Sequence, residues 1–119
     1  MKIAVTSLGA TEESAIDERF GRAKYFIIHD TESGESHAID NESNLNRQQG
    51  AGIQAAELVL REGAGVVMTG HCGPKAFRTL KAAGIEIVVG CTGTVSATID
   101  SYKQGDLKPV DAPDVDMHW

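Results

Sequence analysis

The residues best suited to chemistry lie in the stretch TGHCGPKAFRT, from Thr69 to Thr79. A His-Cys pair ending at Cys72 is followed after five residues by Arg78, which is the spacing typical of cysteine-dependent phosphatases. Such an enzyme needs a cysteine of low pKa and successive backbone N–H groups that hold the phosphate. Pro74 removes one of those N–H groups, and the residues after it have helical spacing. A small cysteine phosphatase is therefore the minor alternative.

The same residues are compatible with a soft-metal site. Cys72 and Cys91 each follow a predicted strand, His71 precedes Cys72, and His118 lies near the C-terminus. Thiolate and imidazole are ligands for metals such as copper, zinc and iron. If the two strands are neighbours, both thiols face one cleft and are close enough for a disulfide. The other interpretation, that both cysteines are small buried residues, stays open because buried unreactive cysteine is common.

Three loops rich in Gly, Ser, Thr and Cys follow predicted strands, over residues 7–11, 69–75 and 90–94. In open α/β sheets, ligands bind beyond the carboxyl ends of the parallel strands. Glycine lets the backbone approach a ligand closely, and the N-termini of helices attract anions. The predicted ligand-binding residues in these loops are Ser7, Gly9, Gly70, Gly73, Thr92 and Gly93.

A fourth segment, DERFGR, adds positive charge. Arg19 and Arg22 flank Phe20 and Gly21, and we predict that all four belong to the site, because arginine donates to anions in a planar fork. The alternative is a charged loop that is merely solvated. His29 and His37, elsewhere in the chain, are expected to be surface or interstrand residues.

Hydrophobic patterns predict the elements that position these residues. Strands are expected over 2–8, 24–30, 35–42, 65–70 and 85–90, with a loop over 44–52. Helices are expected between Gly52 and Gly63, over 74–83 and over 94–103. The order βββαβαβα implies an antiparallel hairpin followed by parallel strands with right-handed crossovers. We predict a mixed five-stranded sheet with helices on both faces, in one domain over residues 1–108, followed by an extended tail over 109–119.

Composition excludes several classes of protein. The net charge is −6, from 17 acidic and 11 basic residues, which argues against a nucleic-acid binder. No apolar run reaches the roughly 20 residues of a membrane span, and the first residues resemble a strand rather than a secretion signal. Two cysteines are too few for a disulfide scaffold. A cytoplasmic protein with thiols is expected.

Several stretches in order along the chain resemble one family. They are MKIAV, DERFGRAKYFIIHD, GAGIQAAELVL, GPKAFRTLKAAGI and TGTVSATIDSYKQGDL. Together they resemble the dinitrogenase iron–molybdenum cofactor biosynthesis family, which includes nitrogenase cofactor carriers and the orange proteins. The resemblance implies a ribonuclease H-like three-layer α/β/α fold, with strand order 3-2-1-4-5 and strand 2 antiparallel.

The resemblance also implies binding or carriage of an anionic metal–sulfur cluster, of the iron–molybdenum or molybdenum–copper sulfide type, and no catalysis. Holding of the cluster in this family can be largely noncovalent. Expected partners are the cluster and proteins that donate or accept it, with the chain a monomer or weak homo-oligomer. A regulatory or interaction module without a cluster is the alternative.

Overall fold

The computed structural model of the chain describes residues 1–42 and 50–113. His118 and most of the predicted loop over 44–52 lie outside these residues. Within them the order of elements is the predicted βββαβαβα. The elements are β1 (Lys2–Ser7), β2 (Tyr25–Asp30), β3 (Ser36–Asp40), α2 (Ala51–Arg61), β4 (Ala64–Met68), α3 (Pro74–Ala82), β5 (Glu86–Val88) and α4 (Val95–Lys103).

The five strands form one mixed sheet in the order β3-β2-β1-β4-β5, as predicted. β2 is antiparallel to both of its neighbours, whereas β1, β4 and β5 run parallel. Ser7 at the end of β1 pairs with Tyr25 at the start of β2. The carboxyl ends of the three parallel strands therefore lie at one edge, where the loops singled out from the sequence emerge.

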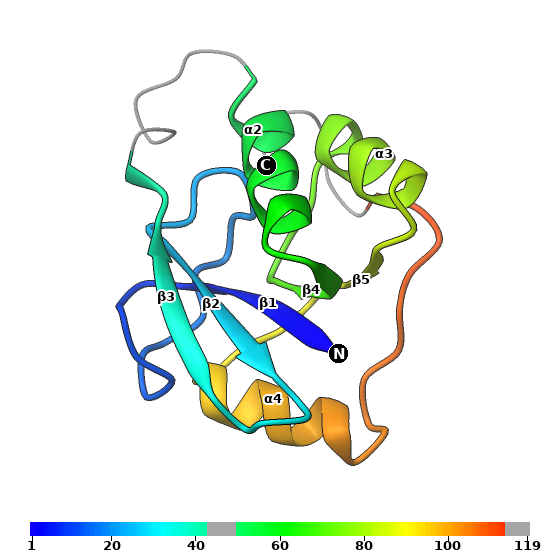
Figure 1. Cartoon of the computed structure of the whole chain (residues 1–119). Coiled ribbons are helices and arrows are strands. Elements are labelled where there is room, and N and C mark those ends of the chain that lie inside the picture. Colours follow the sequence, from blue (N-terminus) through cyan, green and yellow to red (C-terminus); the bar gives the residue numbers. More distant parts are fainter. Residues whose placement is uncertain (43–49, 114–119) are drawn as a thin grey trace.

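Helices cover both faces of the sheet, with α2 and α3 on one face and α4 on the other (Figure 1). Alternate strand residues belong to two buried clusters, because successive side chains of a strand point to opposite faces. Ala4 and Ile28 lie in the cluster under α2 and α3. Ile3, Val5 and Ile27 lie in the cluster under α4. These are called the α2/α3 cluster and the α4 cluster below.

The main difference from the predicted elements is the length of the edge strands. The predicted strand over 85–90 shortens to Glu86–Val88, and the one over 35–42 shortens to Ser36–Asp40. The chain leaves β5 because Gly90 adopts φ 77° and donates its N–H group to Gly70 O at 2.8 Å. Beyond α4 the chain returns along β5, where Val110 N–H donates to Ile87 O at 2.8 Å (Figure 1). In the described part of the chain, no helix has both the length and the apolar character to cross a bilayer.

Candidate functional site

Backbone hydrogen bonds join the predicted loops at the carboxyl edge of the sheet. The loop after β5 bonds to the loop after β4, with Cys91 N–H donating to Thr69 O at 3.1 Å. The DERFGR segment bonds to the same loop: His71 N–H donates to Glu18 O at 2.7 Å and Phe20 N–H donates to His71 O at 3.2 Å. Segments about 50 residues apart in sequence are thus joined by hydrogen bonds at this edge.

The N-terminus of α4, expected to be open to an anion, is closed by the protein itself. Val95 and Ser96 donate their N–H groups to carbonyl oxygens of residues 12–14, at 2.9 and 2.8 Å. The hydroxyl of Thr94 accepts the N–H group of Ala97 at 3.1 Å. Three of the four N–H groups that a helix leaves unpaired are therefore used internally. Thr92 and Gly93 are exposed in the preceding loop, but few N–H groups of the following helix remain available to bind a ligand.

The N-terminus of α3 differs from that of α4 within the described residues. Gly73 precedes it without a side-chain cap, Pro74 begins it, and the first turn contains no acidic residue. The first N–H group that is bonded belongs to Phe77, which donates to Gly73 O at 2.9 Å. Those of Lys75 and Ala76 meet no acceptor in residues 1–42 and 50–113. The exposed side chain of Lys75 adds a cation where the helix dipole already disfavours one. The positive charge that these residues leave without a partner favours an anion here.

The N-terminus of α2 meets that of α3 at the same place. Its cap, Gly50, has φ 80° and no side-chain hydrogen bond, and the first turn again has no acidic residue. A Cβ atom on Gly52 would lie 3.1 Å from the Cβ of Ala76, and one on Gly21 would lie 2.8 Å from the Cα of Gly52. The DERFGR segment and both helix starts are therefore in close contact. Two positive dipole ends converge on one region.

The DERFGR segment exposes its arginines, whereas its phenylalanine and its aspartate are buried. Arg19 is exposed and Arg22 is partly exposed. Phe20, predicted at the ligand, instead lies fully buried in the α2/α3 cluster, with its ring centroid 5.4 Å from that of Phe26. Gly21 is buried beneath α2. Phe20 and Gly21 anchor the segment in the protein, while the side chains of the arginines are at least partly accessible to solvent.

The remaining predicted residues of the first two loops shape the backbone. The buried hydroxyl of Ser7 donates to Gly9 O at 2.7 Å and accepts Gly9 N–H at 3.2 Å, so both groups are satisfied locally. A Cβ atom on Gly70 would lie 2.7 Å from Glu18 O, which leaves space only for glycine. These residues do lie at the carboxyl edge, as the sequence predicted. Their contacts, however, are with the protein's own loops: Ser7 with Gly9, and Gly70 with Glu18.

Replacing Gly70 by alanine is expected to lower the free energy of unfolding by about 1–3 kcal/mol, because the new methyl group overlaps the backbone of Glu18. The measurement is urea denaturation followed by circular dichroism. Gly65→Ala is the matched control, since its Cβ would meet only the flexible side chain of Met1, at 3.6 Å. Equal stability of the two variants would show that the loops separate without cost.

The two cysteines, predicted to share a cleft, lie in different parts of the core. Cys72 is fully buried in the α2/α3 cluster and Cys91 is buried in the α4 cluster, both as thiols. The reason is that the loops after β4 and β5 turn toward opposite faces of the sheet. No three His, Cys, Asp or Glu side chains come together as a metal site within the described residues. His71 is half-buried, and its backbone forms a parallel β-bridge with that of Arg19.

This arrangement argues against the phosphatase alternative. A nucleophilic cysteine must be reachable by substrate and easily deprotonated. The thiol of Cys72 has no exposed surface and lies 3.8 Å from Gly73 O, whereas Arg78 is exposed on α3. The cysteine and arginine therefore do not line one accessible phosphate cradle.

Burial raises the pKa of the Cys91 thiol from 9.0 to about 11. We expect Cys91 in the folded protein to react with iodoacetamide at pH 7.5 at least ~10-fold more slowly than in denatured protein. The folded state holds this proton more tightly than the unfolded chain, so the associated stability is complete below pH 9 and is lost as the pH rises toward 11. Mass spectrometry of the alkylated peptide checks the rate. Rapid labelling of the native protein would contradict the burial.

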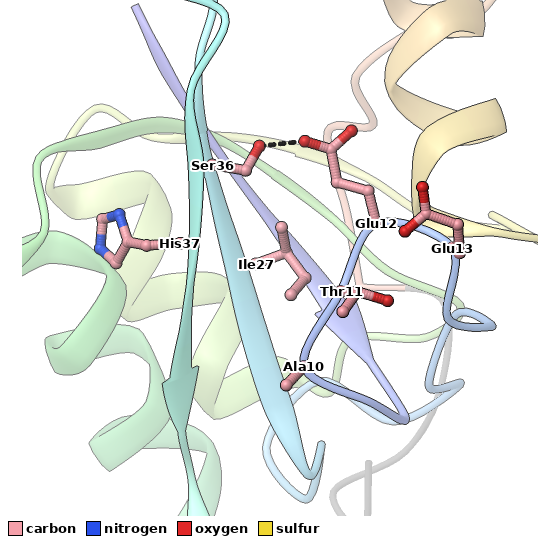
Figure 2. Close-up of a pocket in the computed structure, with 7 residues that line it drawn as sticks. All are labelled: Ala10, Thr11, Glu12, Glu13, Ile27, Ser36 and His37. Carbon is pink, nitrogen blue, oxygen red and sulfur yellow. Dashed lines mark hydrogen bonds between the residues drawn. The ribbon is translucent and has the colours of Figure 1, made fainter.

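A separate cavity of about 420 Å³ lies between residues 10–13 and the β2–β3 hairpin (Figure 2). Glu12 accepts a hydrogen bond from Ser36, whose hydroxyl is 2.7 Å from Nδ1 of the buried His29. His37 points away from these residues and lies 3.2 Å from Glu62. Ala10 and Thr11 of the predicted loop over 7–11 line this cavity, but none of the individually predicted ligand-binding residues does. It is distinct from the region where α2 and α3 begin.

Comparisons with known proteins agree with the overall fold. The family described as dinitrogenase iron-molybdenum cofactor matches residues 1–105, and the chain belongs to that family. The apo form of the orange protein from Desulfovibrio gigas is 36% identical, covers 96% of both chains and superposes with a TM-score of 0.94. A Thermotoga protein of the DUF35 family is 32% identical over 96% of this chain and 98% of its own, with a TM-score of 0.81.

A more distant relative has a similar length. An uncharacterised protein of Methanocaldococcus jannaschii is 28% identical over 111 residues, which is 91% of this chain and 90% of its own. Cofactor- or cluster-related carriage is the general function that the family and the orange protein support.

Sequence reasoning included Lys75 only as the last residue of the predicted loop over 69–75, and it missed Gly52 as part of the candidate site. Signals for both were present: α2 and α3 each begin without a side-chain cap or an acidic residue in the first turn. Such starts are unfavourable for an isolated helix, and rules broken in this way often mark functional positions. The close contact between the two starts depends on tertiary packing and could not be read from either segment.

Proposed function

We propose that this protein binds and carries an anionic metal–sulfur cluster and is a carrier rather than an enzyme. The site is the region where the N-termini of α2 and α3 meet the DERFGR segment. One observation supports this proposal above others: two uncapped helix N-termini converge beside exposed cations in a member of a cofactor-biosynthesis family. It explains how a chain of net charge −6 attracts an anion.

The chemistry of the site favours noncovalent holding. Backbone N–H groups of the first turns donate to sulfide or oxo groups of the cluster, as helix N-termini do for other anions. Arg19 and Lys75 provide full positive charges, and Arg19 also offers a planar set of donors. The buried thiols of Cys72 and Cys91 lie in separate core clusters, so the cargo does not need them as ligands.

The identity of the cargo is the finer part of the proposal. We favour a molybdenum–copper sulfide cluster, the type that the resemblance to the orange proteins implies, over an iron–molybdenum type. The reason is that the orange protein has a similar structure over almost the whole chain. The cluster would pass to and from proteins of cofactor assembly. The strand order and the antiparallel β2 also fit the ribonuclease H-like class to which we assign the fold.

The experiment is to purify the protein without oxygen from cells supplied with molybdenum, copper and iron. The visible spectrum and the content of metal and acid-labile sulfide are then measured. Charge-transfer bands with stoichiometric metal and sulfide are expected, and the metal ratio identifies the cluster. Colourless protein is next titrated with tetrathiomolybdate, alone and with copper(I). Absence of binding in both experiments would overturn the proposal and favour a regulatory module.

A double variant, Cys72→Ala with Cys91→Ala, tests the mode of binding. Noncovalent holding predicts that the folded double variant binds tetrathiomolybdate within about two-fold of the wild-type affinity, because neither thiol contacts the ligand. A two-fold change in affinity corresponds to less than ~0.5 kcal/mol. Loss of binding by a variant that still folds would mean that a thiolate ligates the metal.

A further inference from the structure

We infer that Asp17 is a positioning residue of the cluster site: its buried carboxylate fixes the turn that carries Arg19 and Arg22. The inference rests on the proposed function and adds to it a residue whose side chain does not face the ligand. It starts from an apparent contradiction. Asp17 carries a negative charge, yet it lies beside a region that is proposed to bind an anion.

The carboxylate of Asp17 accepts hydrogen bonds from backbone N–H groups of its own segment. Oδ1 accepts the N–H group of Arg19 at 3.3 Å, and Oδ2 accepts the N–H group of Lys24 at 3.1 Å. These bonds tie the first part of the turn to the start of the following strand, so residues 18–23 are enclosed between them. Hydrogen bonds to an ionised acceptor are roughly twice as strong as neutral ones. The turn is therefore held at both ends by one side chain.

The backbone of Asp17 is itself anchored to the sheet. Its N–H group donates to Thr6 O at 3.1 Å, and the hydroxyl of Thr6 donates back to Asp17 O at 2.7 Å. The same hydroxyl lies 2.9 Å from that of Thr69, at the end of β4. Asp17 is 8% exposed, and Thr6 and Thr69 are fully buried. The turn is thus fixed to the carboxyl ends of β1 and β4, the two strands that define the site.

Glu18 provides a matched comparison. It is adjacent in sequence and carries the same charge, but its side chain is exposed and makes no hydrogen bond within the described residues. Removing the charge of Glu18 leaves the turn intact and reduces repulsion of an anion. Removing the charge of Asp17 also reduces repulsion, but it leaves a backbone N–H group facing an amide that cannot accept both bonds. The two substitutions therefore have effects of opposite sign.

The test is a titration of Asp17→Asn and Glu18→Gln with tetrathiomolybdate, followed by absorbance at low and moderate salt. Asp17→Asn is expected to weaken binding at least ~5-fold. The reason is that the substitution leaves one backbone N–H group of the turn unsatisfied, and the free-energy cost of such a buried group is at least as large as a five-fold change in affinity. Glu18→Gln is expected to tighten binding by up to ~2-fold at low salt, the effect of one charge roughly 10 Å away in water. Tighter or unchanged binding by Asp17→Asn would overturn the inference.

A second readout needs no ligand. Amide hydrogen exchange, measured by NMR on the ligand-free protein, is expected to be at least ~10-fold faster at Arg19 and Lys24 in Asp17→Asn, and unchanged in Glu18→Gln, because only the first loses its acceptor. If the wild type binds no tetrathiomolybdate, the proposed function fails, and these exchange rates alone decide whether Asp17 holds the turn.

A third variant covers the case in which Asp17→Asn does not fold. Thr6→Val removes the hydroxyl bonded to Asp17 O at nearly constant volume. It is expected to weaken binding about 2- to 5-fold, because the hydroxyl's neutral hydrogen bond to Asp17 O and its contact with the hydroxyl of Thr69 are both lost. Unchanged binding and unchanged exchange at Arg19 in this variant would also overturn the inference.

Discussion

Exchanging both Arg19 and Lys75 for glutamate is expected to weaken the binding of tetrathiomolybdate by roughly 100-fold or more. Each side chain offers a charge-assisted hydrogen bond of about 1.5–3 kcal/mol, and each glutamate adds repulsion where attraction is lost. Both side chains are exposed, so the folded structure does not depend on them. The helix N-termini remain, which leaves weak residual binding.

The control is Lys2→Glu with Lys103→Glu, two exposed lysines at the start of β1 and the end of α4. Each exchange lowers the net charge by two, so both double variants carry −10 in place of −6. The control is expected to bind within about 3-fold of wild type, because charges beyond ~10 Å are largely screened in physiological salt. Isothermal titration calorimetry at two salt concentrations compares them. Equal losses in both variants would mean that total charge, not the site, attracts the ligand.

Replacing Phe20 by alanine is expected to lower the free energy of unfolding by about 3–5 kcal/mol. Its ring is fully buried, packs against Phe26 and joins the DERFGR segment to the α2/α3 cluster. A domain of this size has a net stability of only about 5–15 kcal/mol, so the variant keeps a small margin. Cluster binding is expected to fall with it, because the arginine turn loses its anchor.

Urea denaturation at 25 °C measures this loss. Leu60→Ala on α2 is the control, since Leu60 is 45% exposed and its truncation is expected to cost less than about 1 kcal/mol. Phe20→Leu keeps most of the apolar volume and should lie between the two. A loss below ~1 kcal/mol for Phe20→Ala would show that the ring is not part of the core. It would return Phe20 to the ligand surface, as first predicted from the sequence.

Much of the fold was predictable because local patterns and short connections determine it. Alternating and buried apolar runs such as those at 25–30 and 64–68 identify strands, and Pro74 and Gly63 mark helix ends. The order of strands and helices then leaves few arrangements of the sheet. The short edge strand Glu86–Val88 was predicted too long, because the point at which it ends depends on its bonds to β4.

The candidate site was predictable in position but not in detail. Residue types and the predicted strand ends were enough to predict that loops rich in glycine and serine, and a turn with two arginines, meet at the carboxyl edge of the sheet. Tertiary packing places Cys72 and Cys91 on opposite faces of the sheet and buries Phe20. It also pairs the first N–H groups of α4, whereas α2 and α3 begin without a side-chain cap among the described residues. The physical reason is the distance along the chain over which each kind of interaction acts. Strand and helix patterns act over a few residues, whereas the direction of a loop side chain and the pairing of an N–H group depend on segments far away in the chain.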